Sequence, residues 1–132
     1  MDDIIKQITH EIYKQLGKNM SECIYEKAFS VELQQFDIKH STEVILNINY
    51  KGINVGYCRQ DIVIYHNNKY ILIELKAVSK LTSRERDQIK KYLTHNPQSQ
   101  EGYLINFGSR DNPEIFKFEK KTNQEINYKK II

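Results

Sequence analysis

Residues Arg59 to Lys76, RQDIVIYHNNKYILIELK, form the segment around which the other predicted elements are arranged. Two runs rich in β-branched and aromatic residues flank the pair Asn67-Asn68. Asparagine tolerates the positive φ that tight hairpin turns require, so this pattern predicts a β-hairpin. With the two asparagines as the loop, Asp61 on the first strand lies directly opposite Glu74 on the second.

The two facing carboxylates predict a metal site. Opposed residues in an antiparallel pair have Cβ atoms roughly 4.5–5.5 Å apart. Carboxylates that close repel each other unless something neutralises them, and a divalent cation does so. Lys76 follows Glu74 by two residues, so strand alternation returns it to the same face. Asp61 with Glu74 and Lys76 therefore indicates a metal site with a cation beside it.

Two alternatives to this metal site remain open from the sequence alone. Charged residues on a strand usually form a solvated face, and Asp61, Glu74 and Lys76 would then be an ordinary surface network. A slip of the turn by one residue would also send Asp61 to the other face of the sheet. The register of the hairpin decides between these interpretations.

The size and composition are those of a globular protein. The 132 residues predict one domain over residues 1–132, which is long enough to bury a real core. No apolar run approaches the ~20 residues that a membrane helix needs, and the N-terminus lacks a signal-peptide pattern. We therefore expect no membrane association.

The cysteines and the charges limit the class of protein further. Cys23 and Cys58 form no zinc-like cluster, which indicates free thiols in a reducing intracellular compartment, the cytoplasm or, for a viral protein, the host cell. Residues 1–66 carry 7 basic and 9 acidic side chains, a net −2, whereas residues 67–132 carry 13 and 8, a net +5. A basic half would supply phosphate contacts, although lysine also serves solubility. The richness in Ile, Lys and Asn suggests an AT-rich viral or bacterial genome.

The helices follow from apolar spacing and capping signals. Apolar residues three and four positions apart predict helices over residues 4–16 and about 21–36. Thr82-x-x-Glu85 is a capping box, which predicts a third helix that continues to about Thr94. Gln88 and Tyr92 lie one turn apart on the same face of that helix.

The strands complete an α/β pattern. Alternating or continuous apolar runs predict strands at residues 42–50, 53–65, 70–77, 103–107 and 115–118, and Ile131-Ile132 would add an edge strand. The order is two helices, a three-strand meander, a crossover helix and further strands. It predicts an α/β fold with a mixed β-sheet flanked by helices.

Four stretches match a known family in the same order along the chain: Glu22–Ala28, Tyr57–Asp61, Ile73–Val78 and Leu104–Gly108. They resemble the GxxExxY family of the PD-(D/E)XK nuclease-like superfamily, and the likeness covers about residues 4–118. One position departs from the family pattern, because Asn19 stands where the glycine three residues before the motif glutamate is expected. Asparagine is the next-best residue where positive φ is wanted, so we expect the local turn to survive.

The resemblance implies a fold, an activity and a set of site residues. It implies a restriction-endonuclease-like core that hydrolyses DNA phosphodiester bonds with Mg²⁺ or Mn²⁺. Lys76 would orient or deprotonate the attacking water and stabilise the transition state, and Gln88 with Tyr92 would support the site. The metal ligands it implies are the carboxylates of Glu22, Asp61 and Glu74 and the carbonyl of Leu75.

Two other functions are compatible with the same sequence. A catalytically silent nucleic-acid-binding or regulatory module would keep the fold without cleavage. A subunit of a larger complex or a homodimer would pair two such cores to cut both strands. No groove-reading helix or aromatic and basic stripe stands out, although retention of Asp61, Glu74 and Lys76 together favours the nuclease.

Overall fold

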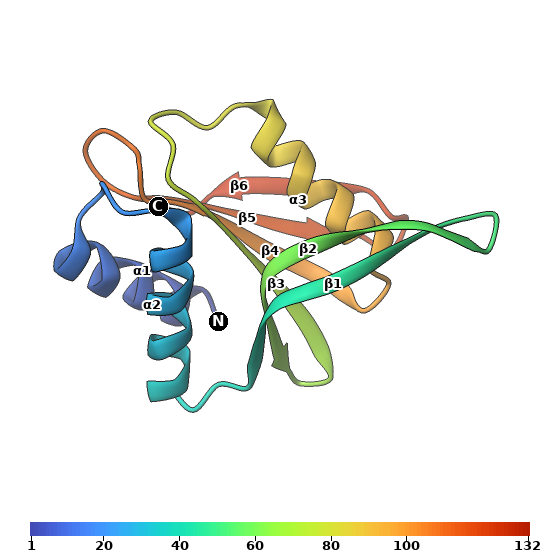
Figure 1. The fold of residues 1–132 in the computed structure, drawn as a ribbon, viewed down its shortest axis with the longest axis horizontal. Coiled ribbons are helices and arrows are strands. Elements are labelled where there is room, and N and C mark those ends of the chain that lie inside the picture. The colour runs from blue at the N-terminus through green and yellow to red at the C-terminus, as the bar shows by residue number, and fades with distance from the viewer.

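A six-stranded β-sheet with helices on both faces forms the body of the molecule in the computed structural model, which describes residues 1–132 (Figure 1). The strands lie side by side in chain order, with β3 and β4 parallel and every other neighbouring pair antiparallel. The strands are β1 His40–Tyr50, β2 Ile53–His66, β3 Lys69–Lys76, β4 Ser99–Asn106, β5 Glu114–Lys120 and β6 Ile126–Lys130. The helices are α1 Asp2–Leu16, α2 Glu22–Gln35 and α3 Ser83–His95. The α/β class and the mixed sheet expected from the sequence are confirmed.

The hairpin between β2 and β3 has the predicted loop and register. Asn67 and Asn68 have φ angles of 52° and 62°, which are the values that a type I′ turn requires. The ladder runs from His66 opposite Lys69 to Ile62 opposite Ile73. A slip by one residue is therefore excluded, and the next facing positions beyond the ladder are Asp61 and Glu74.

Helix α3 connects the parallel strands β3 and β4, and both of its ends are capped. Thr82 and Glu85 form the predicted capping box, in which the Thr82 N–H donates to Glu85 Oε2 at 2.8 Å. At the other end the buried Lys120 ammonium donates to the carbonyl oxygens of Leu93 at 2.7 Å and Asn96 at 3.1 Å. A cation at the carboxyl end of a helix also complements the helix dipole.

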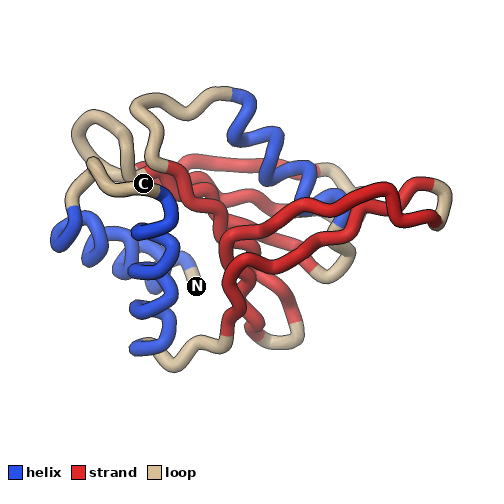
Figure 2. Tube along the Cα trace, in the orientation of Figure 1, coloured by secondary structure: helices blue, strands red, loops and turns tan.

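Helices lie on both sides of the sheet (Figure 2), and each face of the sheet has its own apolar core. Helices α1 and α2 cover one face, where Tyr25 of α2 stacks on Phe107 with ring centroids 4.2 Å apart. Helix α3 covers the other face, where Ile89 and Leu93 pack against Leu72 and Leu104 of the central strands. None of the helices is long and apolar enough to cross a bilayer.

The last strand lies earlier in the chain than predicted. The edge strand is β6, Ile126–Lys130, whereas Ile131 and Ile132 follow it and exchange single backbone hydrogen bonds with Ile115 at 2.9 Å. The polar sequence of β6 concealed it, because an exposed edge strand does not need two apolar faces. Its one aromatic side chain, Tyr128, stacks on Phe118 at 5.0 Å between centroids.

An ion pair joins the first turn of α1 to the sheet. Lys117 of β5 lies 3.0 Å from Asp2 Oδ1, and the Tyr103 hydroxyl donates to the same carboxylate. Burial by itself would raise the pKa of Asp2, but the Tyr103 hydroxyl and the Lys117 ammonium outweigh it and lower that pKa. Burial would likewise lower the pKa of Lys117, and the Asp2 carboxylate raises it instead.

Asp2→Asn should lower the free energy of unfolding at pH 7 by about 0.5–1 kcal/mol, because the pair is partly exposed and screened. Because the pKa of Asp2 is lower in the folded protein than in the unfolded chain, the ionised carboxylate stabilises the fold at pH values above the ordinary pKa of aspartate. This stabilisation is lost as the pH falls through the pKa of Asp2 in the folded protein. The gap between wild type and variant should therefore close in acid, as measured by urea unfolding. Asp3→Asn, in the same helical turn, is the control and should leave stability unchanged. An equal effect of both variants would show that the helix dipole, not this pair, is responsible.

Candidate active site

The centre of the site is the point where β2 and β3 stop pairing through their backbones. Beyond Ile62 and Ile73 the backbones no longer pair, and hydrogen bonds to side chains join the two strands instead. The Asp61 N–H donates to Glu74 Oε1 at 3.1 Å, and the Leu75 N–H donates to Asp61 Oδ2 at 2.9 Å. Each carboxylate thus accepts a hydrogen bond from the backbone of the opposite strand. This exchange holds the two carboxylates on the same face of the sheet.

Strand β1 is also irregular beside Asp61. The ladder between β1 and β2 pairs Thr42 with Ile62 and Val44 with Gln60, but it omits the positions of Glu43 and Asp61. Glu43 has a φ of 54°, a left-handed conformation that is uncommon for a residue other than glycine. The interruption leaves the Asp61 N–H without a partner in β1, so that it is free to bond Glu74.

Asp61 and Glu74 are carboxylates of like charge, and both are largely shielded from water. Glu74 is only 2% exposed, and burial followed by the Asp61 charge raises its pKa well above the usual range. Burial also raises the pKa of Asp61, against the opposing effects of the Leu75 N–H and the Lys76 ammonium. A pair of this kind favours a bound cation, because the cation offsets both the burial and the repulsion.

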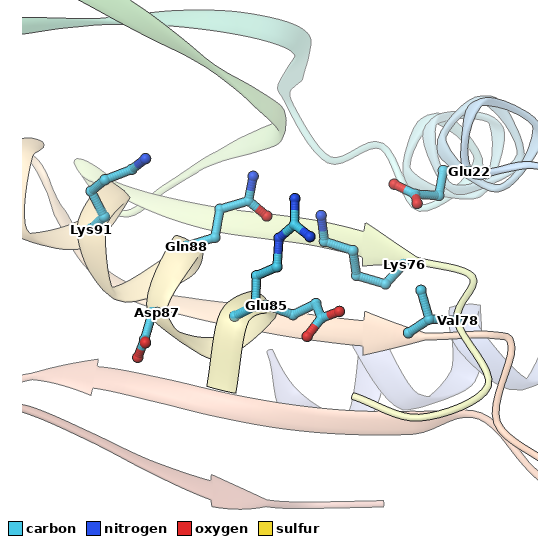
Figure 3. A pocket seen from close by; sticks show the side chains of 8 residues that line it. Glu22, Lys76, Val78, Glu85, Asp87, Gln88 and Lys91 are labelled. Carbon is cyan, nitrogen blue, oxygen red and sulfur yellow. The ribbon is translucent and has the colours of Figure 1, made fainter. Parts of the chain in front are cut away.

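A polar hollow of about 620 Å³ lies between α2, α3 and the end of β3, where Lys76 is one of its lining residues. Figure 3 shows Lys76, Gln88 and Lys91 pointing into the same open space, with the exposed Glu22 facing Lys76 from the start of α2. Three cations, Lys76, Arg84 and Lys91, line it together with three carboxylates, Glu22, Glu85 and Asp87. Its charges therefore balance, and Lys76 is the cation whose charge acts on both Asp61 and Glu74.

Gln88 and Tyr92 form a unit on the face of α3 that covers the site. The Gln88 Nε2 donates to the Tyr92 hydroxyl at 3.0 Å. Tyr92 is almost fully buried, and burial followed by the Glu74 charge raises its pKa to about 12. Its hydroxyl therefore stays protonated at neutral pH. It can donate its own proton, and the bond from Gln88 fixes its orientation.

Comparison with known proteins identifies the superfamily of this chain. A family model for the PD-(D/E)XK nuclease superfamily matches residues 1–130, almost the whole chain. The chain belongs to this superfamily. A search of curated protein sequences found no match. Membership implies nuclease chemistry on a nucleic acid, and nucleases of this superfamily typically use a divalent metal.

The acidic residues of this PD-(D/E)XK protein suit a hard divalent cation, although they do not surround a single ion on all sides. No three His, Cys, Asp or Glu side chains lie close enough together to hold one ion, so Glu22 does not share a ligand shell with Asp61 and Glu74 here. Mg²⁺ commonly takes one or two carboxylates and keeps several waters. The Leu75 carbonyl points to the side of β3 where its N–H meets Asp61, since both groups of a strand residue point the same way. The donor set therefore fits Mg²⁺ or Mn²⁺.

Glu26 is a carboxylate near the site that sequence analysis did not select. It is 7% exposed, and its Oε1 has no hydrogen-bond partner. Burial, the adjacent Glu43 and then Asp61 raise its pKa to about 7. A signal for it was present, because Glu26 shares the helical face of the buried residues Phe29 and Leu33. A glutamate on the apolar face of a helix is rarely buried without a reason.

Asn106 fixes the chain just beyond Lys76, and sequence analysis did not select it either. Its buried side chain accepts from the N–H groups of Val78 at 3.0 Å and Gly108 at 3.1 Å, and it donates to the Val78 carbonyl at 2.8 Å. Gly108 has no room for a side chain, since an added Cβ would lie 2.6 Å from backbone atoms of Ala77 and Val78. These contacts fix the path of the chain after the end of β3.

Gly108→Ala should destabilise the protein by about 1–3 kcal/mol, because the backbone that follows Lys76 has to move. Urea unfolding measures this loss. Ser109→Ala, at the next position of the same loop, is the control and should change stability little. Wild-type stability in Gly108→Ala would show that this loop is free to adjust and does not hold β3.

Proposed function

We propose that this protein is a nuclease that hydrolyses DNA phosphodiester bonds with Mg²⁺ or Mn²⁺. One observation carries the proposal: Asp61 and Glu74 meet on one face where the β2–β3 ladder ends. Lys76 and the Gln88–Tyr92 unit lie on the same side of the sheet, beside a hollow lined by equal numbers of cations and carboxylates. Hard oxygen ligands next to phosphate-binding cations are the combination that metal-assisted phosphodiester hydrolysis needs.

Each site residue has a role in this proposal. Asp61, Glu74 and the Leu75 carbonyl would hold the divalent cation, whereas Glu22 of α2, which does not share their ligand shell, would face it across the hollow. When bound, such a cation lowers the pKa of a coordinated water and neutralises charge that develops on the phosphoryl group. Lys76 binds a phosphate oxygen as a point charge and stabilises the transition state. The Gln88 and Tyr92 side chains keep α3 and the hollow in position.

Within the superfamily, we assign the chain to the GxxExxY family. Asn19 does not adopt the positive φ expected of it, and Gly17, with a φ of 71°, is the residue of this loop that does. The Tyr25 hydroxyl donates to the Gly17 carbonyl at 2.6 Å and accepts from the Met20 N–H at 3.2 Å. The motif tyrosine thereby ties the loop between α1 and α2 to the core, and this loop ends at the residues that place Glu22. Cleavage of both strands of a duplex would call for a homodimer.

The second candidate is a nucleic-acid-binding or regulatory module without catalysis. The observation that favours it is the separation of Glu22 from the Asp61–Glu74 pair, which leaves no group of three metal-binding side chains. An ion held by only two carboxylates binds weakly unless substrate phosphate completes its shell. Metal binding and cleavage, measured separately, distinguish the two candidates.

The deciding experiment is calorimetric titration with Mn²⁺ and Mg²⁺, followed by incubation with supercoiled and single-stranded DNA. We expect wild type to bind the metal and to nick DNA only when metal is present. Glu74→Gln and Asp61→Asn should each lower the cleavage rate by roughly 10²-fold or more, because each removes a charge that holds the ion. Glu11→Gln, on α1, is the matched control and should cleave as wild type does.

The outcomes separate the candidates. Metal binding that is lost in Glu74→Gln, together with metal-dependent nicking, would support the nuclease. Binding without cleavage of any DNA would favour the silent module. If wild type binds no metal even with DNA present, the proposed role of Asp61 and Glu74 is wrong.

The role of the α3 pair can be tested by removing one oxygen atom. Tyr92→Phe keeps the buried ring and removes the acceptor of the Gln88 amide, so we expect kcat/KM to fall by roughly tenfold and stability by about 1 kcal/mol. Tyr13→Phe is the control, because it removes a hydroxyl that bonds a surface carbonyl at 3.2 Å far from the site. Unchanged cleavage by Tyr92→Phe would make this hydroxyl structural only.

A further inference from the structure

The outer parts of β1 and β2 form a two-stranded arm, which we define as residues 44–60. The arm begins where Glu43 and Asp61 interrupt the ladder, and β3 does not pair with it, because the β2–β3 ladder starts at Ile62. Figure 1 shows the arm extending past the end of α3, beyond every other element of the molecule. Strand β2 therefore runs without a break from Asp61 into this projection.

The base and the tip of the arm differ in burial. Leu46, Ile48 and Cys58 at the base pack into the core cluster that α3 covers. Toward the tip the large side chains are open to solvent, and no element covers them. Four of them are more than half exposed: Tyr50 at 62%, Ile53 at 68%, Val55 at 60% and Tyr57 at 63%. Exposed aromatic and aliphatic side chains gathered on a projection mark an interaction surface.

The polar residues of the arm indicate which kind of partner it binds. Residues 44–60 contain no Asp or Glu, whereas Lys51 and Arg59 carry positive charge. The only carboxylate paired with either is that of Glu43, 3.8 Å from Arg59 Nε and largely exposed. The remaining polar side chains are mainly amides and tyrosine hydroxyls, which can both donate and accept hydrogen bonds. A surface of amides, tyrosines and cations without carboxylates complements a polyanion with base edges.

We propose that the arm binds duplex DNA in the major groove and positions the cleavage site on the substrate. The major groove, about 12 Å wide, admits a two-stranded ribbon whose strands are about 4.8 Å apart. From Gln60 to Ile53 the arm reaches about 25 Å, which is about seven base pairs of duplex. The inference rests on the proposed function, because it places the arm on the molecule that Asp61 and Glu74 act upon. A second copy of the chain fits less well, since pairing two arms would bring their positive charges together.

The test compares two double variants that change charge equally and that each replace one exposed large side chain by serine. Lys51→Glu/Tyr57→Ser alters the arm, and Lys14→Glu/Val31→Ser alters exposed positions on α1 and α2. Affinity for a fluorescent duplex of about 20 base pairs is measured by anisotropy in EDTA, which prevents cleavage. We expect the arm variant to lose roughly tenfold or more in affinity and the control to lose little.

A small substrate separates the arm from the active site. Hydrolysis of bis(p-nitrophenyl) phosphate needs only the metal site, so the arm variant should hydrolyse it at the wild-type rate. Wild-type affinity for the duplex in the arm variant would overturn the proposal, even if the protein is a nuclease. Loss of affinity in the arm variant, with no hydrolysis by any form, would support the arm and leave the nuclease proposal without support.

Two further measurements show whether unfolding or a change of oligomeric state causes the loss of affinity in the arm variant. Thermal unfolding followed by circular dichroism should give similar midpoints for both double variants, because every altered side chain is exposed. Light scattering after gel filtration reports the oligomeric state. A dimeric wild type that becomes monomeric in the arm variant would overturn the proposal in favour of a second copy as the occupant.

Discussion

The reciprocal hydrogen bonds at the end of the β2–β3 ladder are the constraint on which the site depends. Asp61 and Glu74 each accept from the backbone of the opposite strand, so the strands stay together where regular pairing has ended. The hydrogen bonds to these side chains thus take the place of one pair of backbone hydrogen bonds between the strands. Because β2 is released there from β3, it continues outward into the arm. One local arrangement therefore places both the acidic pair and the projection beside it.

The surrounding structure compensates for the cost of two like charges in a buried place. Tyr92 and Gln88 cover the pair from α3, and the network around Asn106 holds the chain that follows Lys76. Glu26 adds a second buried carboxyl, from α2, with Glu43 next to it. Burying these carboxyls costs folding free energy, which a bound cation would offset by removing the repulsion.

Local signals in the sequence were sufficient for much of this architecture. Asn67-Asn68 specified a two-residue turn, and that turn set the register that makes Asp61 face Glu74. The Thr82 and Glu85 pair likewise specified the start of α3, because a capping box involves only neighbours in the chain. The early start of β4 at Ser99 and the polar edge strand β6 were missed. Both depend on pairing with distant strands rather than on their own periodicity.

Turns, caps and alternation act over a few residues, so the α/β class, the hairpin and the placement of Asp61 opposite Glu74 could be predicted from the chain alone. Which other groups join the two carboxylates depends on tertiary packing. Glu26 is buried because α2 packs against the sheet, near enough for the Asp61 charge to act on it, and Glu22 at the start of the same helix lies apart from the pair. The exposure of Tyr50 and Tyr57 could not be predicted either, since the alternation of a strand does not show whether another element of the structure will cover its side chains. Burial is a property of packing between distant segments, and no local pattern contains it.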